Sequence, residues 1–464
     1  MNNSHRSKLF IMMVLEFFIW GAWLPLIFGY LPSLGFSPAH PPAALSFLAN
    51  IIPEKFLFVF SEQSLILNAF PVAAIVGMFF SNQYADRHFA AEKFLAFSHL
   101  VGGVAILGCA FTKTFWPFFG LMMVHCLLYV PTISITNSIA FANMKDAQKE
   151  FGLVRMGGTI GWILAAWPFV FILVDYDKVH AANPHGLSEW LGAVLGNPLT
   201  GDAAKAGARS TYIVAGIASL VLTAFSFVLP HTPPKKAGEG AAEKLAWLEA
   251  VKLLKHPFVL VLWLVTLVDS FVHNCYFNWT GVFLGTAKEA GGVGIPGNWI
   301  MPVMSVGQIA EILTMFVLGA TLKRLGWRTT MIFGILGHAA RFAVYAFYPH
   351  QTPVIVVQVL HGICYAFFFA TVYIFVDAYF PKDARASAQG LFNVMILGIG
   401  ALLANSICPW LIQEKFTDPI TKMTDFHGLF LVPMFSGIAA AVALALFFHP
   451  PKTAQASSGV APAH

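Results

Sequence analysis

Long apolar runs recur along the whole chain, each about the length that crosses a lipid bilayer. A helix needs roughly 20 apolar residues to span the hydrocarbon core. A sliding window of that length finds twelve such runs, and each predicts one transmembrane helix. The approximate centres of the runs are Ile19, Ala74, Val104, Val130, Ala165, Val221, Val268, Leu313, Gly337, Phe368, Ala401 and Ala440.

A polar stretch between the sixth and seventh runs divides the chain into two halves. It is rich in Lys, Glu, Pro and Gly, which favour a linker over a membrane span. We expect an N-terminal six-helix bundle over 1–229, a linker over 230–256, a C-terminal six-helix bundle over 257–450 and a tail over 451–464. The predicted fold class is an all-α membrane protein.

Two turns at corresponding places in the halves are weakly similar. Residues 77–87 read GMFFSNQYADR, residues 318–328 read LGATLKRLGWR, and both place a small residue before a short basic turn. This indicates an internal duplication. The turns resemble the loop motif of the major facilitator superfamily, which implies two six-helix bundles with pseudo-two-fold symmetry. In that fold the substrate binds near the midplane, between the halves.

The distribution of Lys and Arg predicts the orientation of the chain. The N-terminal tail, the linker and every second loop together carry about twice as many of these residues as the alternate loops. Because positive charge is retained on the cytoplasmic side, both termini are expected in the cytoplasm. The long segments Phe36–Glu62 and Asp175–Arg209 then lie outside, either as caps over the outer mouth or as plain loops.

Composition supports a membrane protein. The chain has 464 residues, of which 58% are hydrophobic and 11% charged, whereas soluble domains are about 25% charged. Its net charge of +5 does not predict nucleic-acid binding, because the basic residues are spread over loops. The 5 cysteines all fall inside apolar runs and are expected to be buried thiols. No metal site or cofactor is expected.

The eighth run, Ile300–Lys323, carries two polar side chains near its middle. Gln308 and Glu311 are three residues apart and so share a helical face. An ionisable group at that depth is expensive unless it faces protein or water. We therefore predict that this face lines an internal cavity, with Glu311 as a proton-binding residue or a fixed partner of Arg155 or Arg341.

The fifth run also carries polar residues on one face. Arg155, Thr159 and Trp162 recur at helical spacing, and glycines between them would let a neighbouring helix approach closely. Arg155 could donate hydrogen bonds to substrate oxygens or extend its charge to the membrane surface. We predict that it faces the cavity.

The seventh run combines amides, an aromatic ring and a carboxylate. Asn274 and Asn278 share a face with Phe277 close by, and they serve either a binding site or helix–helix hydrogen bonds. Asp269 is a second ionisable group or a gate partner. In the tenth run His361, Tyr365 and Phe368 form a stripe, which would offer aromatic surfaces to a planar base or pack in the core.

Two further polar residues could reach the same cavity. Glu16 precedes a Trp-Gly-Ala-Trp segment in the first run, and Asn137 lies in the fourth run. Glu16 is a candidate for substrate binding or proton coupling, or else a buried structural carboxylate. The remaining intramembrane histidines are expected to pack between helices: His99, His125, His273 and His338.

Motifs of known enzyme classes are missing from the sequence. It shows neither a nucleophile elbow nor a phosphate-binding glycine loop, and its histidines lack metal-ligand spacing. An enzyme is therefore not expected.

Several segments resemble the nucleoside:proton symporters of the major facilitator superfamily. The similarity covers nearly the whole chain apart from residues 36–62, residues 175–209 and the C-terminal tail. The segments are EFFIWGAWL from Glu16, YVPTISITNSIAF from Tyr129, VRMGGTIGW from Val154, SVGQIAEI from Ser305 and RASAQGLF from Arg385.

The resemblance implies roles for residues that match the family pattern. Arg155 and Thr159 fall on nucleoside-binding positions, and Trp162 replaces an aromatic residue that is typically Phe. Gln308 and Glu311 fall on a nucleoside-binding and proton-linked pair. The seventh-run positions correspond to Asn274 and to either Phe277 or Asn278.

The tenth run departs from the family pattern. Where the family has a Tyr followed four and five residues later by Phe and Asp, this chain has His361, Tyr365 and Ala366. Ala366 cannot titrate, so proton coupling would fall to Glu311, with His361 able to assist because imidazole titrates near neutral pH. An uncoupled facilitator and a different substrate are the alternatives.

Together these observations predict a monomeric permease of the bacterial inner membrane that imports nucleosides by alternating access, with proton symport. Its partners would be nucleoside, protons and membrane lipid, and no nucleic acid. One alternative is a major facilitator carrier of another small polar solute, such as a sugar. The other is a membrane receptor or enzyme that transports nothing.

Overall fold

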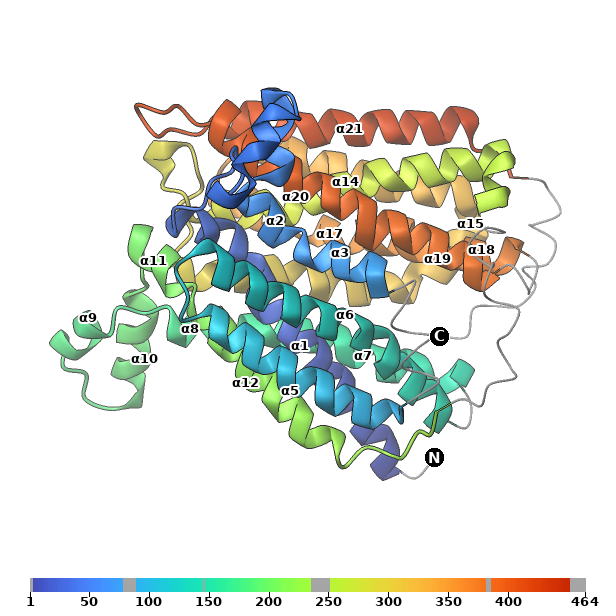
Figure 1. Cartoon of the computed structure of the whole chain (residues 1–464), viewed down its shortest axis with the longest axis horizontal. Coiled ribbons are helices and arrows are strands. Elements are labelled where there is room, and N and C mark those ends of the chain that lie inside the picture. Colours follow the sequence, from blue (N-terminus) through green and yellow to red (C-terminus); the bar gives the residue numbers. More distant parts are fainter. Residues whose placement is uncertain (1–2, 78–88, 145–146, 235–250, 381–384, 451–464) are drawn as a thin grey trace.

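The computed structural model of the chain describes residues 3–77, 89–144, 147–234, 251–380 and 385–450. Within these ranges the chain is helical apart from loops and two isolated β-bridges. The long helices run roughly along one direction, and the first half of the chain lies beside the second (Figure 1). This arrangement is the one that two helical bundles adopt when they share a bilayer.

The N-terminal half packs its helices around one large apolar cluster that includes Met13, Tyr129 and Tyr212. The segment Glu54–Leu67 meets the helix Ala69–Val76 at a bend of 79°. The helices of this half are α1 (Asn3–Ser33), α2 (Glu62–Leu67), α3 (Ala69–Val76), α5 (Ala91–Cys109), α6 (Phe115–Asn143), α7 (Ala147–Ala166), α8 (Phe169–Ile172) and α12 (Ser210–Ser226).

The C-terminal half is built around two clusters, one centred on Trp279 and Phe430 and one on Phe368 and Phe375. Its longest helix changes direction at Gly326, whose φ of 71° and ψ of 173° are non-helical. The elements are α14 (Pro257–Gly285), α15 (Ile300–Phe347), α16 (Gln351–Val356), α17 (Val359–Cys364), η8 (Tyr365–Ala370), α18 (Thr371–Tyr379), α19 (Arg385–Asn393), η9 (Val394–Ile399), α20 (Gly400–Trp410), η10 (Leu411–Lys415) and α21 (Phe426–Phe447).

The predicted spans all correspond to helices. In the described part of the chain, 10 helical segments are long and apolar enough to cross a membrane, or 11 when the bent pair counts as one span. One of them, Gly297–Phe347, has 51 residues and is broken at Gly326, so it accounts for two predicted spans. The all-helical membrane fold is therefore confirmed, and the break at Gly326 is where the long segment divides into the eighth and ninth predicted spans.

The two predicted outer segments lie at the same end of the molecule, which we call the insertion end (Figure 1). The start of α1 and the ends of the polar linker lie at the opposite end, the linker end. The insertions form short helices, namely η1 (Ala43–Asn50), η2 (Glu54–Phe60), α9 (Tyr176–Ala181), α10 (Leu187–Gly196) and α11 (Gly201–Gly207).

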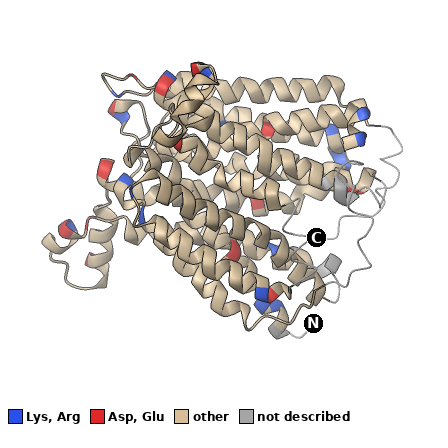
Figure 2. Cartoon of the chain, in the orientation of Figure 1, with Lys and Arg blue, Asp and Glu red and all other residues tan. Residues whose placement is uncertain are grey.

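Charged residues gather at both ends of the bundle, and the broad middle is almost free of Lys and Arg (Figure 2). A few acidic residues lie inside that middle band. Most of the predicted linker, the tail and most of the first basic turn (residues 235–250, 451–464 and 78–88) lie outside the described residues.

The expected close contact at the glycines of the fifth run is found between α7 and α1. A Cβ on Gly157 would lie 2.7 Å from the Phe10 carbonyl oxygen, and one on Gly161 only 2.1 Å from that of Val14. Only hydrogen fits at such positions, so glycine lets the two backbones touch.

We expect Gly161→Ala to destabilise the protein by about 1–3 kcal/mol, the usual cost of overpacking a tight contact. The measurement is the thermal unfolding midpoint of the purified protein in detergent. Gly120→Ala on α6 is the matched control, because a Cβ there meets nothing within 4 Å. Equal midpoints for the two variants would contradict the close α1–α7 contact.

Candidate functional site

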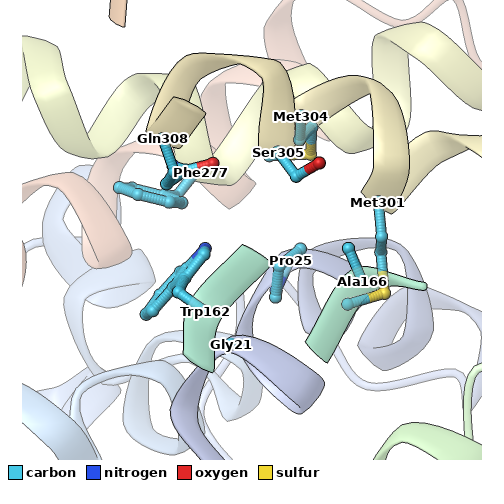
Figure 3. Close-up of a pocket in the computed structure, with 9 residues that line it drawn as sticks. All are labelled: Gly21, Pro25, Trp162, Ala166, Phe277, Met301, Met304, Ser305 and Gln308. Atoms are coloured by element: carbon cyan, nitrogen blue, oxygen red, sulfur yellow. The ribbon is translucent and has the colours of Figure 1, made fainter. Parts of the chain in front are cut away.

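A small cavity lies between the two halves of the chain (Figure 3). Its volume is about 10 Å³, which is roughly the room needed for one water molecule. The site is therefore contracted in this conformation and must expand to admit a solute. Its lining residues are Gly21 and Pro25 from α1, Trp162 and Ala166 from α7, Phe277 from α14, and Met301, Met304, Ser305 and Gln308 from α15.

Two aromatic rings from opposite halves form one side of the cavity. The ring centroids of Trp162 and Phe277 are 6.2 Å apart with planes at 64°. Trp20 supports Trp162 edge-on at 5.2 Å and stacks on Phe70 at 4.6 Å. Figure 3 shows Trp162 and Phe277 facing each other across the gap between α7 and α14. Such faces can stack on a planar ring system.

One amide in the cavity lacks a partner. Gln308 is 6% exposed, and its Oε1 accepts no hydrogen bond. Leaving a buried acceptor unpaired costs about 1–3 kcal/mol, so the amide favours a ligand that supplies a donor. Ser305, one turn away, already donates its hydroxyl hydrogen to the Pro302 carbonyl at 2.7 Å.

A charged region adjoins the cavity on the side of the linker end. The Arg155 guanidinium lies over the Phe17 ring at 4.2 Å and acts electrostatically on Glu311 and Tyr365. In the described structure no salt bridge within 4.0 Å joins Arg155 to Glu311. The fifth-run arginine, the eighth-run carboxylate and the tenth-run tyrosine are thus close enough to interact electrostatically across the two halves. Thr159 is half-buried between Arg155 and Trp162 along α7.

Glu16 is placed elsewhere, inside the N-terminal half. Its carboxylate is fully buried, 2.9 Å from His99 Nε2, and accepts a hydrogen bond from the Thr132 hydroxyl at 2.8 Å. Tyr129 donates to the Glu16 carbonyl at 2.7 Å. This geometry favours the structural alternative for Glu16. Asn137, in the same half, has a buried Oδ1 without a partner.

The asparagines of the seventh run use their amides within the protein. Asn274 Nδ2 donates to the Ser270 carbonyl at 2.8 Å on its own helix. Asn278 Nδ2 donates to Asn405 Oδ1 at 3.1 Å, which ties α14 to α20.

His361 of the tenth run lies against Arg341, with its Nδ1 2.9 Å from Arg341 Nη1. Like the two asparagines, His361 does not line the small cavity.

Several lining residues are absent from the candidates chosen from the sequence. Gly21 approaches α7 so closely that a Cβ would lie 3.1 Å from the Trp162 Cα. Ser305, three residues before Gln308, could have been found by extending the polar face of the eighth run by one turn. Pro25, Ala166, Met301 and Met304 are ordinary apolar residues, and nothing in their types distinguishes them from lipid-facing neighbours.

A larger cavity of about 280 Å³ lies toward the insertion end. Residues of both halves line it, including Gly29, Asn278 and Gln413, and α11 contributes Asp202 and Lys205. The second insertion therefore reaches this larger cavity.

Polar contacts join the halves near this larger cavity. Gln63 and Gln413 exchange amide hydrogen bonds of 3.2 and 2.9 Å. Asn68 donates to the Ser406 hydroxyl at 2.9 Å, and Asn405 donates to the Leu67 carbonyl at 3.0 Å. We call these contacts the clasp. They join α2 and Asn68, which follows it, to α20 and η10, and we expect separation of the halves at the insertion end to break them.

Removing the paired amide with Gln413→Ala should loosen the clasp. Two hydrogen bonds at about 0.5–1.5 kcal/mol each would shift the open population about tenfold. We expect a membrane-impermeant thiol reagent to label Gly29→Cys about ten times faster in this background. The exposed neighbour change Glu414→Ala is the control, and equal labelling rates in both backgrounds would show that the clasp does not limit opening.

Two helical bundles with a central site lined from both define a solute carrier of the major facilitator type. The sequence model of the nucleoside H+ symporter family matches residues 3–185 and 199–453, and the chain belongs to this family. The match includes the first insertion and leaves out residues 186–198 of the second and residues 454–464 of the tail.

Individual relatives agree with this assignment. The chain is 28% identical over 451 residues to YegT of Escherichia coli (strain K12), covering 95% of this chain and 92% of that protein. It is 26% identical to the xanthosine permease of the same organism, covering 96% of each. The crystal structure of the nucleoside transporter NupG superposes with a TM-score of 0.74 at 22% identity, covering 97% of this chain and 100% of NupG.

Proposed function

We propose that this protein imports nucleosides together with protons by alternating access, as a monomer in the bacterial inner membrane with both termini in the cytoplasm. The observation that carries the proposal is the central cavity, where Trp162 and Phe277 from opposite halves face each other beside the unpaired amide of Gln308. Family membership supports nucleoside and proton as the two substrates.

The aromatic pair suits the planar part of a nucleoside. A base that separates the Trp162 and Phe277 rings would stack on one or both, and Tyr365 lies near on η8. Gln308 can accept a hydrogen bond through Oε1 and donate through Nε2, which matches the mixed donors and acceptors of a base edge. A sugar would use only the polar groups and leave the rings without a stacking partner.

Polar side chains around the rings would hold the ribose and the base edge. Arg155 can only donate hydrogen bonds, and its guanidinium lies over the Phe17 ring, two helical turns before Trp162 on α7. Thr159 is one helical turn away, and Asn137 has a free carbonyl oxygen. Asn274 and Asn278 would join the site only after releasing their present partners.

Glu311 would carry a proton. In its charged form the carboxylate attracts Arg155 across the interface between the halves. When a proton binds to a Glu311 oxygen, that attraction is lost and Arg155 is free to bind substrate. Release of the same proton at the cytoplasmic side restores the attraction and resets the carrier. Ala366 offers no second titratable group at its position, and His361 is occupied by Arg341.

Uptake of radiolabelled uridine into proteoliposomes tests this function. Uptake that an inward proton gradient drives above the outside concentration is expected. Equal uptake with and without the proton gradient would support the uncoupled facilitator instead. Competition by sugars but not by nucleosides would favour a sugar carrier, and complete absence of transport would favour a receptor or enzyme.

A further inference from the structure

A buried polar cluster lies inside the C-terminal half, away from the lining of the small cavity. It contains Asp269 and His273 on α14, His338 and Arg341 on α15, and His361 on α17. Asp269, His338 and Arg341 are fully buried, and His361 is 2% exposed. A carboxylate, a guanidinium and three imidazoles in one membrane-embedded cluster are expensive to bury, so the cluster calls for a functional explanation.

Arg341 fixes the protonation of two of the imidazoles. Its Nη1 lies 2.9 Å from His361 Nδ1, and its Nη2 lies 3.0 Å from His338 Nδ1. A guanidinium can only donate hydrogen bonds, so both Nδ1 atoms must be acceptors that carry no proton. A second proton on either ring would break its bond to Arg341 and place like charges together. Both histidines are therefore neutral while these contacts last.

Asp269 is the acid of the cluster, and within the described part of the chain both of its oxygens are unpaired, as are single nitrogen atoms of His273, His338 and Arg341. Among the described residues neither of its carboxylate oxygens takes part in a hydrogen bond, and His338 Nε2 is 3.7 Å from Oδ2. Arg341 attracts the carboxylate electrostatically. A buried carboxylate without hydrogen bonds is strongly disfavoured. Adding a proton would remove that penalty without displacing any existing bond.

The N-terminal half offers an internal comparison. Glu16 and His99 lie on the first and third membrane helices of that half, and Asp269 and His338 lie on the first and third of the other half. Glu16 is 2.9 Å from its histidine and also accepts from Thr132. The Glu16 carboxylate is thus within hydrogen-bond distance of its histidine, whereas the Asp269 carboxylate is too far from His338 for a hydrogen bond. A structural carboxylate would be expected to look like Glu16.

Packing contacts join the cluster to the helix turn that carries Gln308 and Glu311. His361 packs against Gly307, where a Cβ would lie 2.7 Å from the His361 Cβ, and Gly362 packs against the Glu311 backbone. The His361 and Phe277 ring centroids are 5.8 Å apart. Arg341 thus lies between Asp269, which it attracts, and His361, which contacts the turn of α15 that carries Gln308 and Glu311.

The titratable groups around Asp269 come from three elements. The groups on α20 and α21 already face other partners: Cys408 lies 3.6 Å from Cys275, and His427 contacts the Ala346 carbonyl at 3.0 Å. Those that face the cluster are His273 and Tyr276 on α14, His338, Arg341 and Tyr345 on α15, and His361 and Cys364 on α17.

We propose that Asp269 is a second proton-binding site, so that each transport cycle moves one proton on Asp269 and one on Glu311 with each nucleoside. The inference rests on the proposed function. A proton from the outer side adds to a carboxylate oxygen of Asp269 to give the neutral acid, and the same proton leaves to the cytoplasm when the carrier faces inward. No bond other than O–H forms or breaks.

The number of protons can be measured from the limiting accumulation of uridine in proteoliposomes. At zero membrane potential, each coupled proton contributes a factor of ten for one unit of pH difference. The wild-type protein is expected to reach about a hundredfold accumulation. Asp269→Asn is expected to reach about tenfold, and the double change Asp269→Asn with Glu311→Gln should show none.

Glu92→Gln is the matched control, because Glu92 also pairs with a histidine, His231 at 2.7 Å, but at the linker end. It should retain the hundredfold value. Uridine exchange by Asp269→Asn without a gradient establishes that the variant is folded. If the variant does not fold, the number of protons that the wild-type protein couples to each uridine is the deciding measurement. A tenfold limit for the wild-type protein, or a hundredfold limit for Asp269→Asn, would overturn the second site. A wild-type protein that moves no uridine would instead remove the nucleoside function itself.

Discussion

Glu311→Gln should lower the limiting accumulation of uridine at least tenfold for each unit of pH difference, while exchange of uridine across the membrane continues. Glutamine has the shape of the protonated side chain but cannot release a proton, so the cycle loses one coupled proton and the corresponding driving force. Its amide also leaves Arg155 without the charge that now attracts it across the interface.

The measurement is the steady-state ratio of inside to outside uridine in proteoliposomes at two external pH values. The wild-type ratio should fall as the external pH rises, because fewer protons are available to load Glu311, and the variant should show a weaker dependence. Glu289→Gln, in the exposed η6 segment Lys288–Ala290, is a control outside the membrane. Unchanged accumulation by Glu311→Gln would disprove its assigned role.

Trp162→Ala should weaken nucleoside binding about tenfold to a hundredfold. Stacking of a base on an aromatic side chain contributes about 1–3 kcal/mol by alanine substitution, and each 1.4 kcal/mol corresponds to about a factor of ten. The smaller side chain also opens the gap beside Phe277, so the loss should fall on affinity more than on stability.

Uridine binding to the purified protein, measured by calorimetry or by thermal shift, tests this expectation. Trp167→Ala is the matched control, because Trp167 follows the end of the same helix and is 45% exposed. Trp162→Phe should retain most of the affinity, since a stacking face remains. Full affinity in Trp162→Ala would show that the base does not bind between these rings.

The apolar pattern predicted the architecture well. Each long apolar run is centred on a helix of the structure, because a backbone in lipid must satisfy its own hydrogen bonds and a helix is the simplest way to do so. The two spans that deviate are those where local chemistry intervenes. Gly326 lets α15 turn at a positive φ, and the bend before α3 breaks the second span into two segments.

Side-chain partners within the membrane were harder to predict. Arg155, Trp162, Gln308 and Glu311 were identified because polar or aromatic residues on one face of an apolar helix are rare. Glu16 met the same criterion, yet the fold surrounds it with His99 and Thr132. Helical spacing shows which residues share a face, but not which neighbouring helix that face meets.

The sequence by itself determined the membrane setting, the all-helical fold and the family, since these follow from the length, polarity and order of residues along one chain. Only the tertiary structure decided that Trp162 and Phe277 face each other, that Gln63 and Gln413 tie the halves together, and that Asp269 lacks the hydrogen bonds that Glu16 has. Those facts depend on distances between helices far apart in the chain, and small differences in helix packing decide whether a buried carboxylate is satisfied or left free to bind a proton.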